Sequence, residues 1–456
     1  MDLIGLRAQN LFYNIEINSA IFVFDENLLT LYRFTCLHAH TRVMHKQHMN
    51  VKALPMYLKL KSYRLNKCTS NQKKNLIISF VLGISITILC YFLNNCPYPY
   101  WDSLNKYSWL EYFLSNIVPE KNDRSDAFFI NVSYARQVVD YTYSNGNLHG
   151  TIDITNRETL LKFLKIAEET NTYKYIFLDI RFEKGVESEF DSALFDQIKK
   201  MRNISYSSHS DLIDNDKAIP SKAAINDYFT TITSTNFTRY QYLQNGKESA
   251  PLKIFTAIDK TNNKTIKKWG PFFYSDWKLC QNSPFMRIPE DFWIGHEDNG
   301  HQNYYDLGPL LLTTYDVDDW EIEMKDKIVI VGNFVDDLHD TYAGLQPGSY
   351  LIYLAYKGLC NGKQFVSWGF ICIMMIVYIC ISLFVLNRKT IWEFIPFFRN
   401  INNKFLLFIM NMLGFSTIFS LITIILYVFF NNTYNIFFPS LVFTIVNLFI
   451  SYKYQA

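Results

Sequence analysis

The chain has 456 residues, of which 49% are hydrophobic, 17% aromatic and only 19% charged. This composition is too apolar for a disordered chain, and it offers no cationic stripe of the kind that binds nucleic acid. The formal net charge of +2 hides a division: residues 96–363 carry 37 acidic and 28 basic side chains, whereas the remainder carries 5 acidic and 16 basic ones. The eight cysteines include no CxxC pair, so neither a zinc knuckle nor a disulfide framework is indicated.

Residues 1–74 form a basic segment that we expect on the cytoplasmic side. Met49 and Met56 stand just before its most basic part, so the true start codon is uncertain. Four of the nine histidines lie here, but no carboxylate or thiol completes a ligand set, so a solvated segment is the default and no metal is predicted.

Four stretches are long and apolar enough to be transmembrane helices. A bilayer core of about 30 Å needs about 20 apolar residues in a helix, because an unpaired peptide group is costly in hydrocarbon. The four stretches contain no Asp, Glu, Lys, Arg or His and cover residues 75–95, 365–387, 405–430 and 435–452. The fourth is interrupted by Pro439 and Asn447, so it could instead be a membrane-embedded cap.

The orientation follows from the lysines and arginines in the short loops, which are retained in the cytoplasm. The segment before the first stretch is basic, and so is the loop at 388–404, where four basic residues face one glutamate. We therefore expect a multi-pass protein of the inner (cytoplasmic) membrane. Residues 96–364 would lie outside the cytoplasm, with residues 453–456 as a cytoplasmic tail.

Residues 96–364 alternate between buried-strand runs and helical patterns, which predicts a mainly parallel sheet flanked by helices. Thr155 or Asn156 is a plausible N-cap for the first helix. The predicted strands are 128–132, 173–180, 204–207 and 327–331, and the predicted helices are 157–170, 189–202 and 348–359. The fold class is thus a membrane protein with a large extracytoplasmic α/β domain and four transmembrane helices.

Three further segments complete the domain. The dipeptide Asn145-Gly146 predicts a hairpin turn. Residues 208–289 show no long apolar period and are interpreted as an insertion or a β-rich lobe. Residues 333–347 are expected to form a polar loop.

Five segments of the domain carry a resemblance to a known family: residues 175–182 (YIFLDIRF), the DSAL sequence at 191–194, residues 326–332 (DKIVIVG), Asp340-Thr341 and Pro347-Gly348. In these segments the domain is similar to the CHASE2 family of extracytoplasmic sensor domains. The resemblance is not uniform along the chain. It covers about residues 128–448, with 208–289 poorly matched, and the family's order of one span, sensor domain and three spans agrees with the predicted one. Family members often continue into an output domain, whereas here only residues 451–456 follow the last span. The resemblance implies a sensor that signals through a partner.

The candidate ligand-binding residues follow two predicted strands. Asp336, Asp337, His339 and Asp340 cluster after the strand at 327–331, and Asp179 ends the strand at 173–180. The carboxyl ends of parallel strands are where ligands bind, so the cluster and Asp179 could face one crevice. For the cluster we favour a solvated loop whose aspartates cap turns and the next helix, and Asp179 could equally bond backbone amides where the strand passes into the loop.

An enzymatic function is not predicted. No GxSxG elbow, HExxH helix or glycine-rich phosphate loop occurs, and no cofactor is indicated. We expect a membrane-anchored sensor that binds an unknown small molecule or protein and acts on a membrane or cytoplasmic partner. The alternative is a structural or assembly subunit of a membrane complex.

Overall fold

The computed structural model describes residues 54–95, 113, 124–142, 148–210, 213–227, 239–259, 265–284, 286–289, 304–308, 316–387, 403–433 and 435–455. Met1–Lys74 and Asn75–Ala456 are separate compact units, and the α/β body lies in the second. The four histidines of the basic segment, the turn at 145–146 and residues 388–402 of the predicted loop lie outside the described residues.

Six parallel strands form the central sheet, which confirms the predicted parallel pairing. Their spatial order is β12-β1-β13-β4-β5-β6. The strands are β1 (Ala127–Asn131), β4 (Tyr175–Leu178), β5 (Ile204–Ser208), β6 (Ala223–Ile225), β12 (Tyr305–Asp306) and β13 (Ile328–Gly332).

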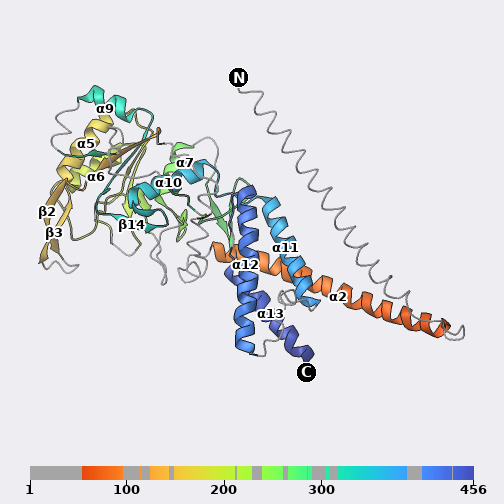
Figure 1. The fold of residues 1–456 in the computed structure, drawn as a ribbon. Helices are drawn as coiled ribbons and strands as arrows, with labels where there is room; N and C mark the ends of the chain where they lie inside the picture. Colours follow the sequence, from red (N-terminus) through yellow and green to blue (C-terminus); the bar gives the residue numbers. More distant parts are fainter. Residues whose placement is uncertain are drawn as a thin grey trace, which may run out of the picture. The chain divides into compact units, whose positions relative to one another are not determined.

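Helices cover both faces of this sheet (Figure 1). One face carries α5 (Arg157–Thr170), α6 (Asp191–Lys200) and α9 (Val317–Met324), and the other carries α7 (Ala250–Ile258) and α10 (Gly348–Cys360). Successive side chains of a strand point to opposite faces, so a strand covered on both sides must be apolar throughout. In β1, Phe128 and Ile130 enter the core under α5 while Phe129 enters the core under α10.

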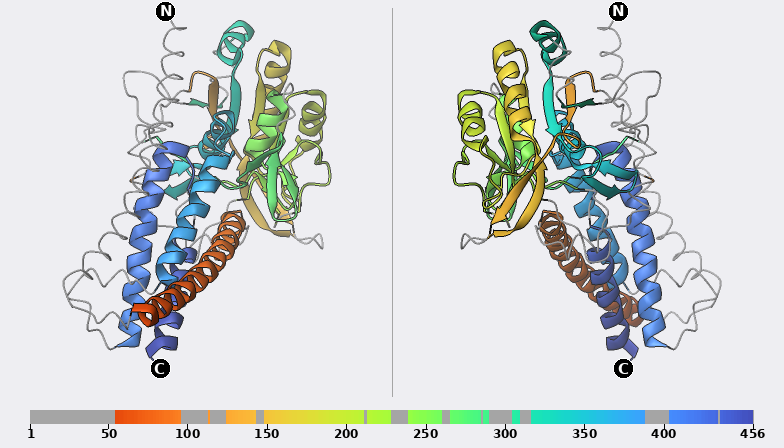
Figure 2. Two further views of the ribbon diagram at one scale, coloured as in Figure 1. Left: turned by 90° about the vertical axis from the view of Figure 1, so that its right-hand side faces the viewer. Right: turned by 90° about the vertical axis from the view of Figure 1, so that its left-hand side faces the viewer.

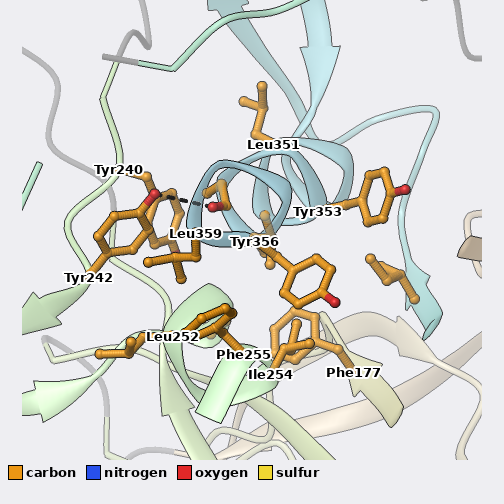
Figure 3. Close-up of a cluster of buried hydrophobic side chains, with 14 of the residues drawn as sticks. Phe177, Tyr240, Tyr242, Leu252, Ile254, Phe255, Leu351, Tyr353, Tyr356 and Leu359 are labelled. Atoms are coloured by element: carbon orange, nitrogen blue, oxygen red, sulfur yellow. Dashed lines mark hydrogen bonds between the residues drawn. The ribbon is translucent and has the colours of Figure 1, made fainter. Parts of the chain in front are cut away.

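The core under α7 and α10 is rich in aromatic residues. Figure 3 shows Phe177 of the sheet, Phe255 of α7 and Tyr356 of α10 gathered in one cluster. The hydroxyl of Tyr242 donates a hydrogen bond of 3.1 Å to the carbonyl of Ala355 (Figure 3). Buried tyrosines of this kind fix α10 by a polar contact as well as by apolar area.

The ends of α5 follow the expected capping chemistry. Of the two predicted N-caps, Asn156 is the one used, since its side chain accepts a hydrogen bond of 2.9 Å from the backbone of Thr159. Asn171 ends the helix in the left-handed region, at a φ of 47°.

Residues 208–289 were predicted to be an insertion or a β-rich lobe, but part of this segment belongs to the α/β body itself. They supply β6, at the edge of the central sheet, and α7, which packs on α10. The smaller elements here are the pair β7 (Leu243–Gln244) and β8 (Lys247–Glu248) and the antiparallel sheet of β9 (Lys267–Trp269), β10 (Phe272–Ser275) and β11 (Lys278–Cys280).

Two hairpins stand beside the central sheet. The predicted hairpin is present as β2 (Arg136–Thr142) and β3 (Leu148–Thr155). The predicted polar loop at 333–347 instead contains a second hairpin, β14 (Leu338–Thr341) with β15 (Gly344–Pro347). Its four-residue strands are too short for a period of two to stand out in the sequence.

Within the described part of the chain, three helices are long and apolar enough to cross a membrane: Asn71–Asn94 within α2 (Leu54–Asn94), α11 (Trp368–Leu386) and Phe405–Phe430 within α12 (Lys404–Phe430). The fourth predicted segment is also helical, as α13 (Phe437–Gln455), but its apolar part, Phe437–Ile450, is shorter. In Figure 2, α13 runs beside α11 and α12.

Polar contacts join the α/β body to these helices. The hydroxyl of Tyr91 in α2 donates a hydrogen bond of 2.6 Å to the carbonyl of Cys280 and accepts one of 3.1 Å from the amide of Phe273. Near the end of α12, the guanidinium of Arg287 donates to the hydroxyl of Tyr427 and to the side-chain oxygen of Asn431. Both contacts are made by residues of the 208–289 segment.

Candidate functional site

A cavity of about 370 Å³ lies at the carboxyl edge of the central sheet. Residues that follow β4, β5, β6 and β13 line it, as expected where several parallel strands end together. The hairpin β2–β3 and the start of α10 provide further walls. The polar lining residues are Arg136, Asp153, Thr155, Arg157, Asp179, Arg181, Glu183, His209, Asn226, Tyr240, Asn333, Asp337 and His339.

Asp179 joins three parts of the fold at this edge. Its carboxylate accepts a hydrogen bond of 2.8 Å from the side-chain amide of Asn226, which follows β6, and another of 2.8 Å from the hydroxyl of Ser349 in α10. Asn226 is held in turn by the hydroxyl of Tyr240, which donates to its side-chain oxygen. The alternative in which Asp179 bonds only backbone amides is therefore not what the structure shows.

The environment of Asp179 disfavours its ionised form. Burial and, to a lesser extent, the nearby carboxylate of Asp337 raise the pKa of this carboxyl to about 6, against the opposing effects of Ser349, His339 and Ser207. Asp179 therefore titrates near pH 6, where a solvated aspartate is already fully ionised.

Gly332, the last residue of β13, allows α10 to come this close. A Cβ at this position would lie 1.9 Å from Oγ of Ser349 and 3.2 Å from Cβ of Asp179. Glycine at the strand end is therefore required by the contact between Ser349 and Asp179.

Asp337 and His339 stand over the first residue of α10. Nε2 of His339 lies 3.4 Å from Oδ1 of Asp337, and the carbonyl of Asp337 accepts a hydrogen bond of 2.9 Å from the amide of Gly348. A Cβ on Gly348 would lie 2.8 Å from both side chains. The start of α10, Asp337 and His339 thus form one packed wall of the cavity.

Asp336 and Asp340 do not line the cavity. Asp336 accepts hydrogen bonds of 3.2 Å from Arg136 and 3.2 Å from Asn333, which makes it part of the turn after β13. Asp340 is exposed on β14, where alternation puts it on the face opposite His339. Of the five candidates, the structure brings Asp179, Asp337 and His339 together.

Arg157 is a cavity-lining residue that the sequence analysis did not identify. It is only 2% exposed, lies 3.5 Å from Asp191 and donates a hydrogen bond of 2.8 Å to the carbonyl of Arg181. Burial lowers its pKa to about 10 and raises the pKa of Asp191, so desolvation outweighs the attraction within the pair. The sequence does carry a signal for Arg157: it lies in the first turn of the predicted helix, where the helix dipole disfavours a cation, so a specific partner is expected.

The lining offers both signs of charge to a ligand. Arg136 and Arg181 could contact an anionic group, and Asp337 and Glu183 could contact a cationic one. Among the residues that the structure describes, no group of three or more His, Cys, Asp or Glu side chains is arranged to hold a metal ion. The arrangement therefore suits a small polar molecule that carries hydrogen-bonding groups of both kinds.

Comparison with known proteins gives no assignment: no family model matches the chain, and neither the curated proteins nor the solved structures contain a match.

Proposed function

We propose that this protein is a membrane-anchored sensor. Its α/β domain, outside the cytoplasm and CHASE2-like, would bind a small polar ligand in the cavity at the carboxyl edge of the sheet. The bound state would be passed through the membrane helices to a partner protein.

The observation that carries the proposal is the position of α10. Its first residues, Gly348 and Ser349, meet the cavity residues Asp337, His339 and Asp179, and its last residue, Cys360, stands just before α11, a helix able to cross a membrane. A ligand that prefers one position of α10 would therefore also bias α11.

The far end of α10 is held to the sheet. The side chains of Tyr353 and Lys357 donate hydrogen bonds to Asp126, just before β1, over 2.5 Å and 3.2 Å. A ligand that shifts α10 would therefore also have to strain or break these contacts with Asp179 and Asp126.

The membrane arrangement in the proposal has four spans. α13 would be the fourth, because Phe443 and Val446 pack in the same apolar cluster as α11 and α12. The basic residues before Asn75 and in the loop at 388–404 support a cytoplasmic position for both segments and an outer position for the α/β domain.

A thermal-shift screen of the full chain in detergent tests ligand binding. A ligand at about 100 times its Kd should add about 2.7 kcal/mol to the free energy of unfolding. The matched variants are His339→Ala, which alters the cavity, and Asp340→Ala, which changes the opposite face of the same strand. We expect a ligand that stabilises the wild type and Asp340→Ala but not His339→Ala. Absence of any stabilising compound, or equal stabilisation of both variants, would contradict the cavity as the sensing site.

Hydrogen exchange then tests transmission. With such a ligand bound, amides of α10 and of the start of α11 should exchange at changed rates. Unchanged rates beyond the cavity residues would leave binding intact but would rule out α10 as the transmitting element.

The hairpin β2–β3 favours a second candidate function, that of an assembly subunit. Val138 is 66% exposed and Leu148 64% exposed on this hairpin, so it presents apolar side chains to which a partner could bind. Purification with native neighbours tests it: a stoichiometric complex that Val138→Glu disrupts, and that no cavity ligand affects, would favour assembly over sensing.

A further inference from the structure

The antiparallel sheet β9–β11 carries two strongly exposed tryptophans. Trp277 is 95% exposed and Trp269 is 74% exposed. Trp277 lies in the two-residue turn between β10 and β11, with Asp276 at a φ of 49° and Trp277 itself at 61°. A bulky side chain rarely adopts this left-handed conformation, where glycine or asparagine is usual. The turn thus holds an indole in water where neither packing nor backbone geometry favours it.

This sheet, which we call the tryptophan sheet, is attached to the helices that are able to span a membrane. The hydroxyl of Tyr91, near the end of α2, bonds to Cys280 and Phe273, and the rings of Tyr91 and Phe272 stack with centroids 5.6 Å apart. Cys280 also forms a β-bridge with Phe365, three residues before α11. The sheet is therefore joined to the end of one candidate span and to the start of the next.

The attachment is apolar as well as polar. Leu279 of β11 packs against the buried cluster that α11, α12 and α13 form with the end of α2. Trp368, the first residue of α11, is 67% exposed, so an exposed indole also stands at the beginning of a candidate span. Exposed tryptophans beside the ends of candidate spans are typical of a membrane interface, where tryptophan and tyrosine side chains concentrate.

The charges of the sheet suit the same surroundings. Lys267, Lys268 and Lys278 are exposed, and Asp276 is the one acidic residue between Lys267 and Cys280. Lysines beside interfacial tryptophans place their ammonium groups among lipid phosphates while their alkyl stems cover apolar surface.

We propose that the tryptophan sheet binds the headgroup region of the bilayer that the protein's own helices cross, with Trp277 and Trp269 inserted at the level of the headgroups. The sheet would then fix the depth of the α/β body at the membrane surface. This inference depends on the helices being membrane-embedded and not on any sensing function, so the two proposals can fail separately.

Fluorescence quenching by lipids tests the proposal on the full chain. The protein is reconstituted in phosphatidylcholine vesicles, either plain or with bromine near the top of the acyl chains. The emission of one tryptophan is obtained as the difference between the wild type and a Phe variant. Trp277→Phe and Trp269→Phe report on the sheet. Trp320→Phe is the control, because Trp320 is 1% exposed within the core under α9.

We expect bromine to remove roughly half or more of the Trp277 emission and to leave the Trp320 emission unchanged, since quenching requires contact with the lipid at interfacial depth. Aqueous iodide should quench Trp277 weakly. The opposite pattern, with Trp277 quenched by iodide and unaffected by brominated lipid, would overturn the proposal. Trp269→Phe gives a second, independent measurement on the same sheet.

Discussion

Ser349, the second residue of α10, donates a hydrogen bond of 2.8 Å to the carboxylate of Asp179 at the end of β4. This contact lies beside the cavity and ties α10, the helix that precedes α11 in the sequence, to the middle of the sheet. The start of α10 is thus held by a carboxylate whose pKa is raised.

The stability of the protein should depend on the ionisation of Asp179. Its folded pKa of about 6 exceeds the ordinary value of 3.8, so the folded state binds the proton more tightly than the unfolded state. The stabilisation from this group is therefore complete below about pH 4 and is lost as the pH rises through about 6. Asp179→Asn, which cannot ionise, should lack this loss, on the order of 2 kcal/mol. The measurement is the difference in Tm between wild type and variant from pH 4 to pH 7. The exposed Asp196→Asn is the control, and a difference that stays constant with pH would contradict the assignment.

Gly332→Ala should destabilise the α/β body, because the new methyl group would overlap Ser349. Overpacking of a buried contact typically costs about 1–3 kcal/mol. Gly308→Ala is the matched control, since a Cβ there meets no atom within 4 Å. Thermal unfolding of the two variants in detergent should show a lower Tm for Gly332→Ala alone. Equal Tm values would mean that β13 and α10 are less closely packed than described.

Arg157→Met should lower the thermal stability of the protein more than a double variant that removes both charges of the buried pair Arg157–Asp191. The single variant leaves Asp191 buried without its cation, which costs about 3–5 kcal/mol. The double variant Arg157→Met with Asp191→Leu should recover part of this loss, although Ser188 and Asn215 lose their acceptor. Thermal unfolding of the wild type, both single variants and the double variant forms a double-mutant cycle. Strictly additive changes would show that the two side chains do not interact.

Trp277→Gly should raise the thermal stability of the protein in detergent while it removes the proposed lipid contact. The left-handed backbone at this position costs a non-glycine residue about 1–2 kcal/mol, and the sequence Asp-Gly favours the two-residue turn. The expected result is a Tm a few degrees higher than that of the wild type, with Trp269→Gly, outside the left-handed region, showing no gain. A fall in Tm on Trp277→Gly would mean that the indole packs on the protein rather than facing outwards.

Much of the fold was predictable because its strands are buried on both faces and its helices are amphipathic. The runs at 128–132 and 327–331 and the helix at 157–170 agree with β1, β13 and α5 within two residues. β6 and β12 were not predicted, because strands of three and two residues carry no readable period. α7 had a usable signal in Pro251 within its first turn, but its nine residues are few for a helical pattern.

The site was predictable only in part, because the sequence does not show which residues of the loop after β13 face the cavity. The sequence places four polar residues after β13 but does not show that a strand begins at Leu338. Once β14 forms, Asp337 and His339 share one face and Asp340 takes the other. Arg157 and Tyr240 line the cavity because segments distant in the sequence pack together, and no local sequence pattern predicts this packing.

The contacts of Cys280, Leu279 and Arg287 with the helices that are able to cross a membrane have a practical consequence for handling this protein. A fragment cut to the α/β body alone would expose to water the apolar side chains that pack against these helices, and we expect it to precipitate. Ligand discovery and antibody selection are therefore best carried out on the intact chain in a lipid or detergent shell.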